Sequence, residues 1–368
     1  MMRVFLLVIV SLLSPTALFS QIAAPAPSAQ SASNSAPGAV AVSTLPSDPG
    51  AILALGTKMN GLDGLGVKPW HIKFTYQTFN SDGDPESSGT YEEFWVSDKI
   101  YKRSYTGDSF TQTDFGTAHG LYRSGNQNWP ELREMKMRAA LIQPMLNNAN
   151  LSEVNLEMSD RSFDQVQLQC VALKPKANRI LKTMNAPPSY PYIHYCFDRK
   201  HPILRFDSKG IGLDDTLYNN ITVFQGHYVA RDVHLVSARK PVFNLHVETL
   251  EELAAMSEAS FAPLPGAVGP IGGKVTLPAS VAQSLALSHC SAEYFFSAGR
   301  AHAYGTAVVQ TTIGKNGHVT SASGTTGPKE LQRAAVECIR HQEFRPFLVQ
   351  GEAVEVESNI GMSLMGNQ

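Results

Sequence analysis

The chain has 368 residues, 43% of them hydrophobic, which is enough for two ordinary domains with packed cores. Charged residues make up only 17%, below the usual quarter, and the formal net charge is −2. Because the chain carries no basic block, its composition argues against nucleic acid as a partner.

The first residues have the pattern of an export signal. Arg3 precedes an apolar run over residues 4–13, and Pro15 and small residues near Ser20 follow. The run is shorter than the roughly 20 residues that a membrane-spanning helix needs. We therefore expect a cleaved signal peptide at 1–20 and a periplasmic protein. The alternative is an uncleaved leader that anchors the protein in the inner membrane.

Composition divides the remaining chain into four parts. Residues 21–49 are rich in Ala, Pro and Ser and predict a disordered tether. Residues 50–258 are rich in strand patterns, residues 259–280 are rich in Pro and Gly and predict a linker, and residues 281–368 form a second domain.

The first domain is predicted to be a curved antiparallel sheet with helices. Trp70, Ile72, Phe74 and Tyr76 alternate with polar residues, which is typical of a half-buried strand. Short helices are expected at 51–65 and 130–146. Further strands are expected at 89–105 (two strands), 110–116, 119–125, 154–158, 165–173, 192–197, 203–207 and 221–237.

The C-terminal residues predict strand, tight turn, strand, helix and strand. The strands cover 306–313, 318–323 and 354–364, and an Asn-Gly pair at 316–317 makes the turn. Pro328 opens the helix. One apolar stripe along it consists of Leu331, Ala334, Ala335, Cys338 and Ile339. The chain is therefore predicted to be α+β, with one main helix on a small antiparallel sheet at its C-terminal end.

This last region, from about 267 to 368, resembles the TonB C-terminal domain family. The resemblance lies in the IGKNGHV hairpin, the Ala334–Ala335 pair, and Phe344, Arg345 and Pro346 at the helix end. It implies a cell-envelope protein that binds a receptor segment, in energy-coupled transmembrane transport in the family's own transducers. The order of elements in the first domain resembles the half-barrels of the LolA/LolB type, which implies an interior that holds an acyl chain or a peptide.

The resemblance directs attention to the last strand as a partner-binding edge. An extended partner segment that adds to a sheet edge is held by backbone hydrogen bonds. The residues assigned to this edge are Val354, Val356, Ser358, Ile360 and Met362.

The four cysteines are expected to be paired, since export places them in an oxidising compartment. We expect one disulfide within each domain, Cys170 with Cys196 and Cys290 with Cys338. Buried free thiols are the alternative.

Other polar clusters have structural interpretations. Asp82, Asp84 and Glu86 fit a hairpin turn better than a calcium loop. The adjacent pairs Asp214–Asp215 and Glu251–Glu252 are expected to be solvated, because neighbouring side chains diverge. His194 and His201, with Cys170 and Cys196, are a weaker metal hypothesis than the disulfide.

No metal or cofactor is therefore assigned, and no catalytic motif is present in the sequence. The first hypothesis is a non-enzymatic envelope protein that binds its partner by strand addition. The second is a periplasmic carrier or sensor that uses the half-barrel. A hydrolase is the third and weakest.

Overall fold

The computed structural model describes residues 44–63, 66–108, 110–145, 151, 154–163, 166–176, 193–208, 214–254, 256–287, 290, 292–295, 298–299 and 301–364. The predicted signal peptide lies outside these ranges, as does most of the predicted tether. Within the described ranges, no helix combines the length and apolarity needed to cross a bilayer.

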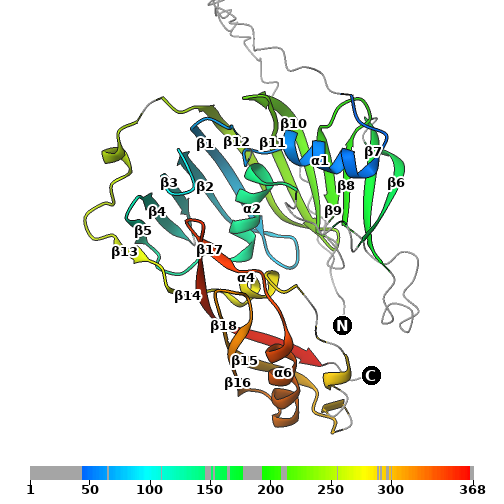
Figure 1. The fold of residues 1–368 in the computed structure, drawn as a ribbon, viewed down its shortest axis with the longest axis vertical. Helices are drawn as coiled ribbons and strands as arrows, with labels where there is room; N and C mark the ends of the chain where they lie inside the picture. Colours follow the sequence, from blue (N-terminus) through cyan, green and yellow to red (C-terminus); the bar gives the residue numbers. More distant parts are fainter. Residues whose placement is uncertain are drawn as a thin grey trace, which may run out of the picture. The chain divides into compact units, whose positions relative to one another are not determined.

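The larger module is built on one antiparallel sheet that curves around two helices (Figure 1). The helices are α1 (Pro49–Met59) and α2 (Leu132–Ile142). Across the sheet, the strands are β13 (Val268–Ile271), β5 (Gly120–Gly125), β4 (Thr111–Thr117), β3 (Tyr101–Gly107), β2 (Pro85–Trp95), β1 (Trp70–Phe79), β12 (Lys240–Glu252), β11 (His227–Ser237), β10 (Asp214–Phe224), β9 (Leu204–Ser208), β8 (Ile193–Asp198), β7 (Val166–Pro175) and β6 (Val154–Phe163).

Alternation along β1 explains how this sheet and its helices share a core. Trp70, Ile72, Phe74 and Tyr76 are all buried, as their spacing predicts. They join the same apolar cluster as Ile52 and Leu53 of α1 and as Met137 and Leu141 of α2. Both helices thus cover one face of the sheet, and the α+β prediction is confirmed for this module.

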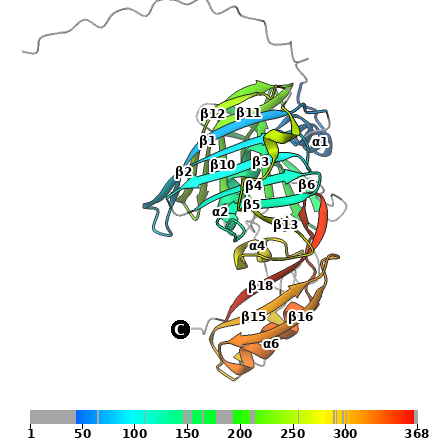
Figure 2. The same cartoon turned by 90° about the vertical axis from the view of Figure 1, so that its left-hand side faces the viewer.

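The smaller module is a second sheet with one main helix, α6 (Lys329–His341). Its strands are β14 (Lys274–Thr276), β18 (Glu352–Leu364), β15 (Gly305–Ile313) and β16 (Val319–Thr326), and β17 (Phe347–Val349) also pairs with β18. Its short helical segments are α4 (Ala279–Ser284) and η3 (Ala292–Phe295), whereas η2 (Glu258–Phe261) contacts β4 of the larger sheet. All five residues of the predicted helix stripe are buried against β15 and β16 (Figure 2).

The turn between β15 and β16 requires glycine for two reasons. Gly317 has φ +83°, and a Cβ at this position would lie 1.9 Å from the carbonyl oxygen of Phe344. The same residue accepts a hydrogen bond from the Phe344 backbone N–H at 2.9 Å. The predicted Asn-Gly turn is confirmed, and it also anchors the chain that leaves α6.

The predicted linker at 259–280 is not a free segment. Its residues form η2, β13 and β14, and the last two are strands of the larger and the smaller sheet, respectively. The smaller sheet therefore begins at Lys274, before the predicted boundary at 281. Strand β12 was not predicted, although it pairs along most of β1.

Candidate functional site

The outer border of β18, on the side opposite β15, is already paired with β14 from Glu355 to Glu357. Strand β15 pairs with β18 from Val356 to Leu364, β17 pairs with it from Glu352 to Val354, and β14 pairs with it from Glu355 to Glu357. The Glu355 N–H donates to the Gly273 carbonyl at 2.8 Å, and the Leu277 N–H donates to the Glu357 carbonyl at 2.9 Å. The prediction of an open edge at Val354 and Val356 is therefore wrong.

The five residues assigned to this edge have another role. Val354, Val356, Ser358 and Ile360 are all less than 5% exposed, and Met362 packs on the same core. The backbone groups that face β14 belong to the odd-numbered Glu355 and Glu357. The pattern of side chains identified the buried face, but the neighbours of a strand depend on elements elsewhere in the chain.

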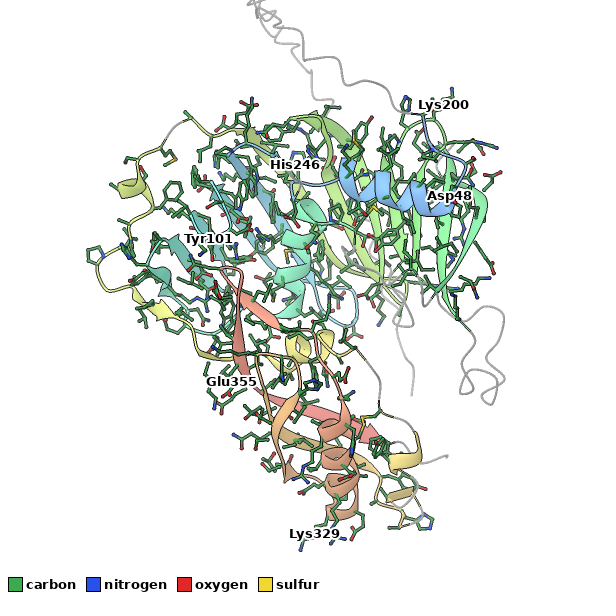
Figure 3. The ribbon with its side chains drawn as sticks, viewed as in Figure 1. Asp48, Tyr101, Lys200, His246, Lys329 and Glu355 are labelled. Carbon is green, nitrogen blue, oxygen red and sulfur yellow. A yellow bond between two sulfur atoms is a disulfide. The ribbon has the colours of Figure 1, made fainter. Side chains whose placement is uncertain are left out.

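Strand β14 is short and directly follows two glycines. Gly272 and Gly273 precede it, and a Cβ at either position would contact nothing within 4 Å. Its Lys274 ammonium lies 2.6 Å from Glu357 and 3.2 Å from Glu355, the residue labelled on β18 in Figure 3. Hydrogen bonds to Glu357 and Glu355 raise the pKa of Lys274. On the inner face, Val275 is 5% exposed and packs in the core.

Past Glu357, no described strand pairs with the outer side of β18. Helix α4 packs on β18, and the Gln283 side chain donates to the Gly361 carbonyl at 2.9 Å. The border therefore changes from strand pairing to side-chain coverage along its length.

The interior of the larger module holds a buried charge network around Glu93. Glu93 of β2 is fully buried and accepts hydrogen bonds from Arg103 of β3 at 3.1 Å and from Arg138 of α2 at 2.8 and 3.0 Å. The hydroxyl of Tyr91 also donates to Glu93. The network fixes α2 to the sheet through charge as well as apolar packing.

The environment of Glu93 keeps it ionised. Burial alone would raise its pKa, but the positive charges of Arg138 and Arg103 and the hydrogen bonds from Arg138 and Tyr91 outweigh that effect. The pKa of Glu93 is lowered to about 2.

A cavity of about 140 Å³ lies between α2 and the sheet, next to this network. Its walls combine apolar, aromatic and charged side chains: Leu62, Asp63, Trp70, Trp95, Asp98, Arg138, Ala139, Ile142 and Gln143. Trp70 and Trp95 stack with ring centroids 5.6 Å apart. Burial and the charge of Asp98 raise the pKa of Asp63, while Arg138 opposes them.

One buried donor at this cavity has no protein acceptor. Trp70 is 1% exposed, and its indole N–H finds no hydrogen-bond partner among the described residues. Strand periodicity placed Trp70 in the core correctly. It could not identify the cavity, because Asp63, Asp98 and Arg138 come from three separate segments of the chain.

Both predicted disulfides are present. Cys170 and Cys196 are cross-strand partners on β7 and β8, and Cys338 of α6 is bonded to Cys290. Each bond lies within one module, as expected. The metal hypothesis for Cys170 and Cys196 is therefore replaced by a disulfide.

The acidic residues singled out in the sequence lie in a turn and in ion pairs. The side chain of Asn80 caps the predicted turn by accepting from the N–H groups of Asp82 and Asp84, each at 2.9 Å. Glu86 pairs with Arg133, and Asp214 with Lys136. Glu251 is 63% exposed, as expected of a solvated residue, and it also contacts a histidine.

That histidine is His71, which sequence analysis did not single out. Its Nδ1 lies 2.8 Å from Glu251 and its Nε2 lies 2.9 Å from Glu92. Only a doubly protonated ring can donate to both carboxylates. Pairing of β1 with β12 and with β2 produces this arrangement. The only sequence feature that pointed to it was the alternation of apolar and polar residues along β1.

One part of the chain matches a known family. Residues 292–362 match the family described as Gram-negative bacterial TonB protein C-terminal. A comparison with curated proteins found no match.

Similar solved structures cover the larger module. A LolA superfamily protein from Nitrosomonas europaea is 11% identical, with a TM-score of 0.37, over 60% of this chain and 98% of its own. A putative outer membrane lipoprotein-sorting protein domain from Vibrio parahaemolyticus is 10% identical, with a TM-score of 0.35, over 57% and 94%. MucB in complex with MucA(peri) is 11% identical, with a TM-score of 0.24, over 60% of each chain.

Proposed function

We propose that this chain is a non-enzymatic cell-envelope protein whose smaller module binds an extended partner segment as a strand beside β18. The match to a TonB C-terminal family over 292–362 supports an envelope role. The observation that carries the proposal is that a three-residue strand, β14, occupies a border of the thirteen-residue strand β18.

In this proposal β14 is a placeholder that the partner replaces. Few hydrogen bonds hold β14, and each contributes only about 0.5–1.5 kcal/mol net. A longer guest strand continues past Glu357 towards Asn359 and Gly361 and gains further backbone bonds there. The guest must also move α4, which packs on this part of β18.

The residues of β14 indicate which guest sequence fits. A basic residue is required between Glu355 and Glu357, where Lys274 now lies. An apolar residue must follow it to fill the buried position of Val275. We therefore propose a partner segment that alternates basic or polar residues with β-branched or aliphatic ones.

A disulfide lock tests the exchange. Lys274 and Glu355 are cross-strand partners, so K274C/E355C can fix β14 to β18. A photo-crosslinking amino acid at Asn359 then reports partners in intact envelopes, with K274S/E355S as the matched variant without the lock. We expect one defined protein to crosslink in the serine variant and to be lost in the locked one. Equal crosslinking in both variants would contradict strand exchange.

A second candidate function is a carrier or sensor role for the larger module, and the cavity at Trp70 favours it. At about 140 Å³ the cavity is smaller than the roughly 300–1,000 Å³ of sites that enclose drug-sized ligands. The carried molecule would therefore place only a small group inside. Native mass spectrometry of the exported protein tests this role, and a co-purified small molecule or lipid is the expected result.

A further inference from the structure

The larger sheet ends at β6, a long strand with one open side. Strand β6 pairs with β7 along its whole length without a bulge, and no described strand pairs with its other side (Figure 1). Its ten residues make a long edge. Natural sheets usually keep an exposed edge short, bulged or covered, because it can pair with another chain.

The disulfide on the two neighbouring strands shows which backbone groups face this open side. The Cα atoms of Cys170 on β7 and Cys196 on β8 are 4.0 Å apart, which is typical of a cross-strand pair that exchanges no backbone hydrogen bonds. Cys170 therefore directs its N–H and C=O towards β6, where its partner is Ser159. The Gln167 carbonyl, on the opposite side of β7, accepts from the Arg199 N–H at 3.0 Å, which agrees with this assignment.

The open side of β6 therefore carries the backbone groups of the even-numbered residues. Successive residues of a strand direct N–H and C=O to opposite sides, so Ser159 faces β7 and its two neighbours face outwards. None of the outward N–H and C=O groups has a hydrogen-bond partner among the described residues. The outward residues are Val154, Leu156, Met158, Asp160 and Ser162.

The charges on β6 select one way for the strand to pair with itself. When two antiparallel copies are related by a two-fold axis at Ser159, Glu157 of each copy lies opposite Arg161 of the other. Registers centred on Glu157, Asp160 or Arg161 instead place like charges face to face, which is destabilising. Charged residues normally protect an edge from pairing, and here they do so in these three registers.

The backbone groups are matched in the register centred on Ser159. Outward residues meet outward residues, as Met158 opposite Asp160 of the second copy illustrates. Four such pairs form, and each exchanges two backbone hydrogen bonds. Glu157 and Arg161 belong to the intervening pairs without backbone bonds, where opposing side chains lie closest.

The side chains that would meet are accessible. Glu157 is 56% exposed and contacts Lys174 of its own chain, while Arg161 is exposed and forms no ion pair with a described residue. Met158, on the other face, is 38% exposed although it is apolar. In the register centred on Ser159, the Met158 side chains of the two copies are diagonal neighbours and cover each other.

We propose that two copies of this chain pair through β6 as an antiparallel dimer centred on Ser159, which joins their larger sheets into one. This inference does not rest on strand exchange at β18, because β18 belongs to the other sheet. The dimer would carry two β18 borders and would therefore bind more tightly to a partner that presents two segments.

Disulfide trapping of the full exported chain tests the register. Ser159→Cys places the thiols of the two copies opposite each other, in a pair without backbone bonds like that of Cys170 and Cys196. We expect mild oxidation to link the chain into dimers, with peptide mapping to identify the linked positions. Ser162→Cys is the matched control, since its position lies opposite Leu156 and away from its own copy. Equal dimer yields from the two variants would overturn the register.

Charge reversal tests the same pairing at equilibrium, by sedimentation of the uncrosslinked chain. Arg161→Glu sets a like charge against Glu157, and we expect it to raise the Kd of the dimer about tenfold or more, because each dimer contains two such pairs. Glu157→Arg should do the same, and the double variant E157R/R161E should restore most of the lost affinity. Arg333→Glu makes the same charge change on an exposed residue of α6 and should leave Kd unchanged. A double variant no tighter than the single ones would overturn the proposal.

Two further outcomes would also overturn it. One is a chain that sediments as a monomer at every concentration and gives no dimer in Ser159→Cys. The other is a disulfide from Ser159→Cys to a different protein with no copy-to-copy product, which would assign the edge to another occupant. Neither outcome affects strand exchange at β18, since the K274C/E355C lock reports on a different sheet.

Discussion

The two modules stabilise their interiors in different ways. Every buried charged residue in the described part of the chain belongs to the larger module: Glu93, Asp114, Arg123, Glu134 and Asp207. The core of the smaller module is apolar, and its buried polar side chains are Thr311 and Ser358. A buried charge is costly unless it is paired, so the larger module depends on pairing geometry.

This difference separates two kinds of recognition. Paired charges hold α2 in place and leave a cavity with defined polar groups, which suits a small ligand. The smaller module offers few side-chain features outside its core, but β18 exposes backbone groups to whichever strand lies beside it. Under the functions proposed above, the larger module would select a ligand by charge, and the smaller module would select a segment by its ability to form a strand.

The largest effect is expected from breaking the charge network. Glu93→Gln removes the carboxylate that Arg103 and Arg138 share, and leaving buried partners uncompensated costs about 3–5 kcal/mol. The measurement is the free energy of unfolding in urea, followed by tryptophan fluorescence. Glu92→Gln is the control, because the neighbouring side chain is 39% exposed and pairs with His71 instead. A loss below about 1 kcal/mol in Glu93→Gln would show that the network does not hold the module together.

Acid should destabilise the larger module more than the smaller one, because only the larger module depends on the ionised Glu93. The pKa of Glu93 falls from 4.5 to about 2 on folding, so its ionisation stabilises the folded state above the unfolded pKa. This contribution, about 3 kcal/mol, is lost as the pH falls from about 5 towards 2. We expect the fluorescence of Trp70 and Trp95 on β1 and β2 to show this loss, measured in a Trp129→Phe chain because Trp129 contacts Phe347 of β17. Glu93→Gln should flatten the pH dependence over this window, and an unchanged slope would assign it to other groups.

The smaller module should instead be sensitive to backbone changes. Gly317→Ala and Gly351→Ala both place alanine at positive φ, which costs roughly 1–2 kcal/mol. Only the Cβ at Gly317 meets the Phe344 carbonyl, whereas open space surrounds Gly351. We expect Gly317→Ala to lower the free energy of unfolding by about 2 kcal/mol more than Gly351→Ala does. Hydrogen exchange of the β15 amides measures this difference. Equal losses would mean that the Phe344 segment can move aside.

The sequence could predict the features that depend on a short stretch of residues, and it could not predict those that depend on contacts between distant residues. The core stripes of β1 and α6 were predictable because periodicity alone places Trp70 and Leu331 inside. Strand β14 was not, since three residues in a glycine-rich stretch have no periodicity of their own and pair with a strand about 80 residues away. The cavity was also invisible, because it requires Asp63, Asp98 and Arg138 to meet in space. Local patterns therefore indicated the cores, while both candidate sites depended on long-range pairing.

The smallest effect is expected at Ser358, and its sign distinguishes a structural role from a binding role. Its hydroxyl is buried in the smaller module and has no hydrogen-bond partner among the described residues. Removing an unsatisfied buried polar group is neutral or stabilising, so Ser358→Ala should raise the free energy of unfolding by up to about 1 kcal/mol. Thr311→Val is the control, because the Thr311 hydroxyl donates to the Val309 carbonyl. If Ser358→Ala instead lowers stability and also reduces crosslinking at Asn359, the hydroxyl has a partner at the border of β18. If stability rises and crosslinking persists, recognition there depends on the backbone and not on this side chain.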